Sequence, residues 1–293
     1  MKTNTKKYLV KPNDKFLIQD FNTTYDGHLD KEAGKEELER VKEELSKYQE
    51  TLYAAGKHAV LIIFQAMDAA GKDSAIEHVM SGINPQGCQV YSFKTPNSVE
   101  YKHDFLWRHY KALPERGKIG IHNRSHYENV LVCKVHPEYI LSEDIPGYDS
   151  VKKIDQKFWK NRYDSIRNFE KHLTDNGTVI LKFFLHVSKE EQKQRFLDRI
   201  DEPSKNWKFA AGDLKERALW KEYMNAYETA IKETSTENAP WYVIPADKKW
   251  YTRLAISQIV AETLEDLNLK YPVLPKEEAS QLEVLKQQLL AEK

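Results

Sequence analysis

The chain has 293 residues, of which 40% are hydrophobic, so it is long and apolar enough to form one large domain or two small ones. Basic and acidic residues are balanced at 45 each, which argues against a protein that coats nucleic acid. No apolar run approaches the ~20 residues of a membrane-spanning helix, and Cys88 and Cys133 have no metal-binding spacing, so we expect a cytoplasmic protein with reduced thiols.

The first predicted element is an amphipathic helix over residues 30–54, where apolar side chains recur at helical spacing until Gly56. Short apolar runs typical of buried strands begin near Ala59, Cys88, Lys118, Thr178 and Trp241. Helical patterns lie over residues 100–111, 125–134, 151–173, 188–200 and 212–232, and a peripheral helix is expected after Pro275. Strands that alternate with helices predict an α/β fold with a central parallel five-stranded sheet covered on both faces.

The predicted organisation is one central domain with an inserted lid. An N-terminal extension and helix are expected over residues 1–55, and the central domain over residues 56–270. Residues 201–213 include turn residues and few aliphatic side chains, which indicates a mobile loop and places the lid at about residues 195–220. Residues 271–293 are expected to form a helical tail.

The segment FQAMDAAGKD, residues 64–73, is similar to a phosphate-binding loop, G-x-x-x-x-G-K-[ST], that is altered in two places. Ala66 replaces the first glycine, and Asp73 replaces the hydroxyl residue that usually binds Mg²⁺. A strand is predicted before the loop and a helix after it, which is the context that phosphate binding requires. The residues expected to bind phosphate are Ala69, Ala70, Gly71, Lys72 and Asp73. The alternative is an ordinary strand–helix turn with an exposed lysine.

Asp68 lies inside this loop, where a carboxylate would repel a phosphate unless a metal ion lay between them. We therefore expect Asp68 to hold Mg²⁺, or Mn²⁺ in its place. Both acids in the loop also have simpler explanations. Asp68 can bond its own backbone as a turn residue, and Asp73 can be an acid in the first turn of a helix.

A second group of polar residues, Asn123, Arg124 and Glu128, follows the strand predicted near Lys118. In phosphate-loop enzymes this strand end often carries a Mg²⁺-binding aspartate, and an arginine there suits a bidentate contact with phosphate. Ser125 and Glu128 also fit the S-x-x-E capping box, which would explain both residues without any function.

With these motifs the chain resembles family-2 polyphosphate kinases. The resemblance extends from about residue 14 to about residue 267 and includes FQAMDAAGKD, GINPQG, HDFLWRHY, IHNRSHYENVLV, NWKFAAGDLKERALWKEY and APWYVIPADKKWYTRL. Ala66 together with HNRSHYEN is most similar to class III, whose members phosphorylate AMP and ADP. The resemblance implies a P-loop kinase-like three-layer sandwich with a helical lid. It also implies reversible, Mg²⁺-assisted, in-line transfer of the terminal phosphoryl group of inorganic polyphosphate to AMP and ADP.

Carried over by position, the resemblance marks Asp68, Lys72 and Arg124 as phosphate or metal contacts. The lid residues expected to bind polyphosphate are Arg195, Arg199, Lys208 and Arg217. Two arginines one helical turn apart can contact neighbouring phosphates, although a solvated charged face would have the same spacing. The candidates for binding the acceptor nucleotide are Lys94, Asp104, Arg108, Asn123 and Arg124. Asp104 and Arg108 could instead pair with each other across a helix face.

Other classes of the family tend to have an aspartate at position 123 and an asparagine at position 128, whereas this chain has Asn123 and Glu128. We therefore expect Glu128 to supply the missing charge. The predicted catalytic residues are Asp68, Lys72, Arg124 and Glu128, with Asp68 and Glu128 as metal ligands.

Two other functions are compatible with the same fold. An ATP-dependent nucleoside monophosphate kinase would normally keep a serine or threonine after Lys72, and a non-catalytic sensor of nucleotide or polyphosphate would normally lose that lysine. The expected partners are polyphosphate, AMP, ADP, ATP and other purine nucleotides, without nucleic acid or membrane. The resemblance further implies a homo-oligomer, either a dimer or a tetramer.

Overall fold

The centre of the computed structural model, which describes residues 4–12 and 15–292, is a six-stranded sheet with the order β1-β6-β5-β2-β4-β3. The predicted five parallel strands are confirmed. They are β2 (Ala59–Ala66), β3 (Cys88–Ser92), β4 (Ile119–Asn123), β5 (Thr178–His186) and β6 (Trp241–Pro245). A sixth strand, β1 (Leu9–Val10), pairs antiparallel with β6 at one edge. The sequence pattern missed β1 because two residues are too few to show a period.

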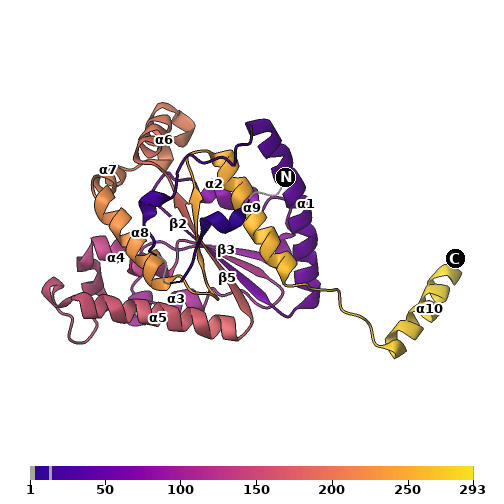
Figure 1. Cartoon of the computed structure of the whole chain (residues 1–293). Helices are drawn as coiled ribbons and strands as arrows, with labels where there is room; N and C mark the ends of the chain where they lie inside the picture. The colour runs from indigo at the N-terminus through magenta and orange to yellow at the C-terminus, as the bar shows by residue number, and fades with distance from the viewer. Residues whose placement is uncertain (1–3, 13–14, 293) are drawn as a thin grey trace.

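Helices cover both faces of the sheet, as Figure 1 shows. On one face lie α1 and α9, and on the other lie α5 and α8. The helices are α1 (Lys31–Ala55), α2 (Lys72–Val79), α3 (Trp107–Tyr110), α4 (Val132–Val135), α5 (Gln156–Asp175), α6 (Lys189–Asp201), α7 (Ala211–Ala218), α8 (Trp220–Thr234), α9 (Lys249–Asp266) and α10 (Lys276–Ala291). The predicted three-layer α/β fold is therefore confirmed.

The first helix was predicted correctly because its sequence carries clear boundary signals. Asp30 caps α1 by accepting from the amides of Glu32 and Ala33, and Gly56 ends it with a left-handed φ of 59°. One face of α1 packs on α9, where Trp250 lies so close to Gly34 that a Cβ there would be 2.1 Å from the indole. This glycine therefore lets the two helices approach each other.

The helix predicted over residues 212–232 is two helices, α7 and α8, which meet at Leu219. Two other predicted helices, over residues 100–111 and 125–134, are wrong in extent. The chain forms single turns there, α3 and α4, joined by 3₁₀ turns. The 3₁₀ segments of the chain are η1 (Thr5–Tyr8), η2 (Ile18–Asp20), η3 (Pro85–Gly87), η4 (Glu100–Lys102), η5 (His126–Asn129), η6 (Pro137–Glu143), η7 (Val151–Lys153) and η8 (Pro203–Lys208). Three of them, η4, η5 and η6, line a cavity beside the sheet together with α3 and α4.

The predicted lid contains α6, η8 and α7, which stand at the upper left of Figure 1 beside the carboxyl ends of the strands. At the other extreme α10, drawn in yellow, lies apart from the rest of the chain, and every residue from 276 to 291 is exposed. The proposed division at residues 55 and 270 stays a prediction; part of its N-terminal segment, residues 1–3 and 13–14, lies outside the described residues. Across the described ranges, no helix has both the length and the apolar character to cross a membrane.

Candidate active site

The altered phosphate loop joins β2 to α2 and brings Asp68 and Lys72 to the carboxyl edge of the sheet. The loop turns at Ala69 and Gly71, whose φ values of 58° and 102° are left-handed. Successive residues in such turns present their amides to one side, which is the geometry that binds anions. Ala66 needs no such freedom, because it is the last residue of β2 and its φ is not positive. The loss of the first glycine therefore leaves the anion-binding turn intact.

Lys72 begins α2, and its Nζ donates to the carbonyl oxygen of Ala66 at 2.7 Å. Burial lowers the pKa of this ammonium, and the carboxylate of Asp68 acts in the opposite direction. Asp73, the next residue, is exposed and accepts a hydrogen bond from Asn123 Nδ2 at 2.6 Å. This contact joins the start of α2 to the end of β4.

Arg195 of α6 binds the backbone of the phosphate loop through its guanidinium. Its five N–H groups all donate within the protein, to Glu191 Oε1 and to the carbonyl oxygens of Ala69, Ala70, Ala246 and Asp247, at 2.7–3.0 Å. The side chain is 5% exposed, so these bonds are shielded from water. In this structure every donor of the guanidinium is used within the protein, so the contact of Arg195 with polyphosphate stays a prediction and would require some of these bonds to be exchanged.

The other lid residues lie farther out. Arg199 Nη1 donates to the carbonyl oxygen of Lys208 at 3.2 Å, and Arg217 Nη1 donates to that of Lys189 at 2.7 Å. Lys208 itself is exposed, with its Nζ 5.0 Å from the centre of the Trp207 ring. Arg195 and Arg199 therefore do not act side by side, although they are one turn apart on α6. Their spacing predicted a shared face, but Arg199 points to the lid loop.

At the end of β4 the backbone makes a strained turn at Arg124, whose φ is 63°. A left-handed conformation is unfavourable for a non-glycine residue and is found mostly at functional sites. The Arg124 amide donates to the carbonyl oxygen of Phe64, and its guanidinium lies 3.8 Å from Asp68 Oδ1. The predicted pair of Arg124 and Asp68 is thus brought together across β2 and β4, and the arginine is 43% exposed toward any ligand.

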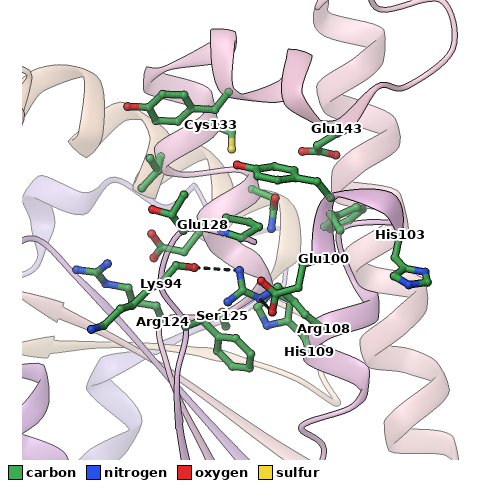
Figure 2. Close-up of a pocket in the computed structure, with 18 of the residues that line it drawn as sticks. Lys94, Glu100, His103, Arg108, His109, Arg124, Ser125, Glu128, Cys133 and Glu143 are labelled. Carbon is green, nitrogen blue, oxygen red and sulfur yellow. Dashed lines mark hydrogen bonds and ion pairs between the residues drawn. The ribbon is translucent and has the colours of Figure 1, made fainter. Parts of the chain in front are cut away.

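Glu128 lies in η5, and its carboxylate enters the cavity beside Arg124 (Figure 2). With the Gln65 amide oriented by its neighbours, Gln65 Nε2 donates to Glu128 Oε1 at 2.8 Å, and its oxygen accepts from the Ser125 amide at 3.1 Å. Burial raises the pKa of Glu128, and the nearby cations of Arg124 and Lys72 partly offset this shift. Half of the capping-box alternative is found: the Ser125 hydroxyl caps η5 by accepting from the Tyr127 amide at 3.2 Å, whereas the Ser125 amide donates to Gln65 and not to Glu128.

The cavity next to Glu128 has a volume of about 420 Å³, which suits a nucleotide-sized ligand. Its lining includes four of the five predicted nucleotide-binding residues, namely Lys94, Asp104, Arg108 and Arg124. The fifth, Asn123, is not brought there among the described residues, since its amide is bonded to Asp73.

Asp104 and Arg108 do not pair with each other, although their spacing would allow it. Arg108 Nε lies 3.3 Å from Glu100 Oε1 and its Nη1 donates to the carbonyl oxygen of Lys94 (Figure 2), while Asp104 caps the Leu106 amide. Arg108 is therefore fixed at the cavity wall by two contacts that the sequence pattern did not predict.

The wall of the cavity opposite Lys94 and Arg124 was not predicted from the sequence. It is formed by η4, the segment between η4 and α3, α4 and η6, and its residues are Tyr101, Phe105, Val132, Cys133, Tyr139 and Glu143. Glu143 is bound by Arg162 of α5, which donates to both carboxylate oxygens at 2.9 and 2.8 Å. No single motif contains these residues, since Phe105 lies in HDFLWRHY, Val132 ends IHNRSHYENVLV and the other four lie outside both, so no signal in the sequence connected them.

The acidic residues of the site fit Mg²⁺ only as a partial ligand set. Within the described part of the chain, no group of three or more His, Cys, Asp or Glu side chains could hold a metal ion. Mg²⁺ is commonly bound by one or two carboxylates, with water and substrate phosphates as the remaining ligands. Asp68 and Glu128 both lie near Lys72 and Arg124, so a pair of carboxylates beside a phosphate site is available.

Comparison with known proteins gives concordant matches over nearly the whole chain. A family model described as Polyphosphate kinase 2 matches residues 28–272. An ADP-polyphosphate phosphotransferase of Rhodopseudomonas palustris is 53% identical over 99% of this chain and 100% of the relative. An AMP/ADP-polyphosphate phosphotransferase of Meiothermus ruber is 47% identical over 91% and 95%. A crystal structure of Polyphosphate Kinase 2 from Arthrobacter aurescens has a TM-score of 0.88 and 38% identity, covering 98% of this chain and 97% of that one.

Proposed function

Because the chain belongs to the polyphosphate kinase 2 family, it is a polyphosphate-dependent nucleotide phosphotransferase, and we propose that it phosphorylates both AMP and ADP. The terminal phosphoryl group of inorganic polyphosphate passes to AMP to form ADP, and to ADP to form ATP. One phosphoanhydride bond breaks as another forms in the transfer to either acceptor's phosphate. The reaction is therefore nearly balanced and reversible, and concentrations set its direction.

The observation that carries this proposal is that two different sites lie at the same edge of the sheet. One is suited to phosphates, and the other is large enough for a nucleotide. The loop at Ala69–Lys72 offers amides and a cation, which suits a donor that is a uniform chain of phosphates. The separate cavity of about 420 Å³ suits the acceptor nucleotide. Arg124 and Glu128 line this cavity at the side where it approaches the loop.

The residues then have distinct roles in positioning and charge neutralisation, which account for most of the catalysis of phosphoryl transfer. The loop amides and Lys72 orient the end of the polyphosphate, and Arg124 contacts the transferred group. Asp68 and Glu128 would hold Mg²⁺, or Mn²⁺, whose chemistry is to neutralise the charge on the phosphate oxygens. Asp73 and Asn123 support the loop by linking α2 to β4.

Transfer to AMP as well as ADP rests on Glu128. The chain has the Asn123 and Glu128 pair that the resemblance associates with class III, and the relative from Meiothermus ruber is named for both acceptors. The relative from Rhodopseudomonas palustris is named for ADP alone. Both relatives therefore support ADP as an acceptor, and one of them also supports AMP. We infer that the chain accepts both, and other purine nucleotides more weakly.

The test uses the purified protein with Mg²⁺, AMP and long-chain polyphosphate in the absence of added ATP. Ion-exchange chromatography should show ADP first and ATP later. If only added ADP were converted, the phosphotransferase activity would be established, but the proposal that AMP is an acceptor would be contradicted. If neither acceptor reacted, and ATP with a monophosphate gave diphosphates instead, the nucleoside monophosphate kinase would be the correct function. Light scattering on the same sample would test the homo-oligomer.

A further inference from the structure

We propose that Glu143 recognises the base of the acceptor nucleotide by accepting a hydrogen bond from the exocyclic amino group of adenine. The cavity thereby selects AMP against IMP, in which a carbonyl oxygen replaces that amino group. This inference rests on the proposed use of the cavity as the acceptor site, and it adds a specificity residue outside the motifs.

The two ends of the cavity differ in chemistry, which orients the nucleotide within it. At one end Arg124 and Glu128 face the phosphate loop, and Lys94 and Arg108 lie nearby (Figure 2). The acceptor phosphate must lie at this end, because the transferred group comes from the loop. In the view of Figure 2, Glu143 lies at the upper right, away from Arg124 and Lys94. The base therefore extends toward Glu143.

The wall around Glu143 suits an aromatic base. Tyr101, Phe105, Val132 and Tyr139 present apolar surface to the cavity. Flat rings and aliphatic side chains of this kind contact the faces of a base without distinguishing one base from another. A polar group at the edge of the base is needed for that distinction, and Glu143 lies in this wall with its side chain 12% exposed.

The carboxylate of Glu143 is rigid and electrically compensated. Arg162 donates to both of its oxygens, at 2.9 and 2.8 Å, and is itself only 4% exposed. The guanidinium is held in turn between Phe105 and Phe158, with its central carbon 4.3 and 4.8 Å from the ring centres. A bidentate pair fixes the plane of the carboxylate. Its charge is neutralised, so it does not repel the phosphates of the nucleotide.

A carboxylate oxygen bonded once by arginine keeps a further lone pair for a ligand donor, and it cannot donate. The 6-amino group of adenine can satisfy it. At the position of the 6-amino group hypoxanthine has a carbonyl oxygen, which would place two acceptors against each other, and its nearest donor, N1–H, lies one ring position away. A site built to bind a donor rejects an analogue that lacks it, because a buried polar group is then left unpaired.

The experiment measures kcat/KM with polyphosphate for AMP, IMP and purine riboside monophosphate, which has no 6-substituent. The wild-type protein should prefer AMP over each analogue by at least about tenfold, mainly through KM. Glu143→Gln should bring the AMP to IMP ratio close to one, because an amide can also donate. Glu138→Gln is the matched control, since Glu138 is exposed on the same η6 turn and should leave the ratio unchanged.

Equal kcat/KM for AMP and both analogues in the wild-type protein would overturn the inference, and so would an unchanged ratio in Glu143→Gln. The comparison of analogues needs no variant, so the inference stays testable if Glu143→Gln does not fold. Failure of the proposed function gives a different result, because the wild-type protein would then transfer nothing from polyphosphate to AMP.

Discussion

At the scale of single residues, the two departures from the usual phosphate-loop pattern have separate structural reasons. The first glycine is dispensable because Ala66 still belongs to β2, and the backbone reverses only at Ala69 and Gly71. Asp73 replaces a hydroxyl residue, but its carboxylate is bonded to Asn123. We therefore expect a metal ion to be held by carboxylates elsewhere and not at position 73, which makes Glu128 the residue whose substitution is most informative.

Replacing Glu128 with Gln should lower kcat at least about tenfold and raise the Mg²⁺ concentration needed for half-maximal rate, because a neutral amide is a poor magnesium ligand. Initial rates with AMP and polyphosphate across a magnesium titration measure both effects. Glu138→Gln, on an exposed turn nearby, is the control for a lost carboxylate. A normal rate and an unchanged magnesium dependence in Glu128→Gln would show that this carboxylate holds no metal.

Replacing Lys72 with Met should abolish nearly all transfer while the melting temperature changes by no more than about 3 °C. The ammonium makes one hydrogen bond, to Ala66, and burial lowers its pKa, so keeping the charge there opposes folding. Its loss therefore removes a phosphate contact at little cost in stability. Lys171→Met serves as the control, because Lys171 is exposed and pairs with Asp175. Substantial remaining activity in Lys72→Met would contradict phosphate binding by the loop lysine.

At the scale of secondary-structure elements, the sequence predicted those whose pattern is local and failed where tertiary packing decides. The helix α1 has a cap at each end and one apolar stripe, so its limits were predicted to within one residue. By contrast α9 was missed, because it is covered by the sheet on one side and by α1 on the other. Its apolar residues therefore occur on all sides and show no helical period.

In the candidate site, too, residues within local motifs were predicted, and residues brought together by tertiary packing were not. Lys72, Asp68, Arg124 and Glu128 lie in two contiguous motifs at neighbouring strand ends, and parallel strands bring such ends together. The bonds of Arg195 to the loop carbonyls of Ala69 and Ala70 were not expected, because residue spacing does not show which neighbour a helix face contacts. The pair of Glu143 and Arg162 joins η6 to α5, and neither residue has a spacing that marks it as part of a site.

The strand β4 carries a buried histidine that makes folding stability depend on pH. Burial lowers the pKa of His122 to about 4, while its Nε2 donates to the Ala112 carbonyl oxygen at 3.1 Å. The unfolded chain has the ordinary pKa of about 6.5, so it binds the proton first as the pH falls. Stability is therefore complete above about 6.5 and is lost progressively toward 4, at about 1.4 kcal/mol per pH unit for this one group.

His122→Gln should reduce that loss, because glutamine can donate to the same carbonyl and does not titrate. Between pH 7 and pH 5 the free energy of unfolding of the variant should fall by about 2 kcal/mol less than that of the wild-type protein. Urea unfolding at the two pH values measures the difference. The buried His186, whose pKa burial also lowers to about 4, remains in both proteins and supplies the common background. Parallel losses in the two proteins would show that His122 is accessible to protons in the folded state.

At the scale of the whole molecule, the sheet topology explains how one domain handles two phosphorylated substrates. The strand β2 lies between β5 and β4, so its loop meets the lid helix α6 on one side and the turn at Arg124 on the other. Gln192 of α6 donates to the Asp68 carbonyl oxygen at 2.8 Å, which ties the lid to the loop.

The tail contributes no buried surface to this arrangement, and that leads to a simple expectation for its removal. Every residue from 271 to 292 is exposed, including Leu285 at 50% and Leu289 at 67%. Hydrophobic stabilisation is roughly proportional to apolar area removed from water, at about 25 cal/mol per Å², so an exposed helix adds almost none. A chain ending at Lys270 should keep its melting temperature within about 2 °C and its kcat/KM for AMP within about twofold. Thermal melting and the polyphosphate assay measure these, with light scattering to record the oligomeric mass of both forms. A larger drop in stability or activity would mean that α10 packs against this chain or a second copy in solution.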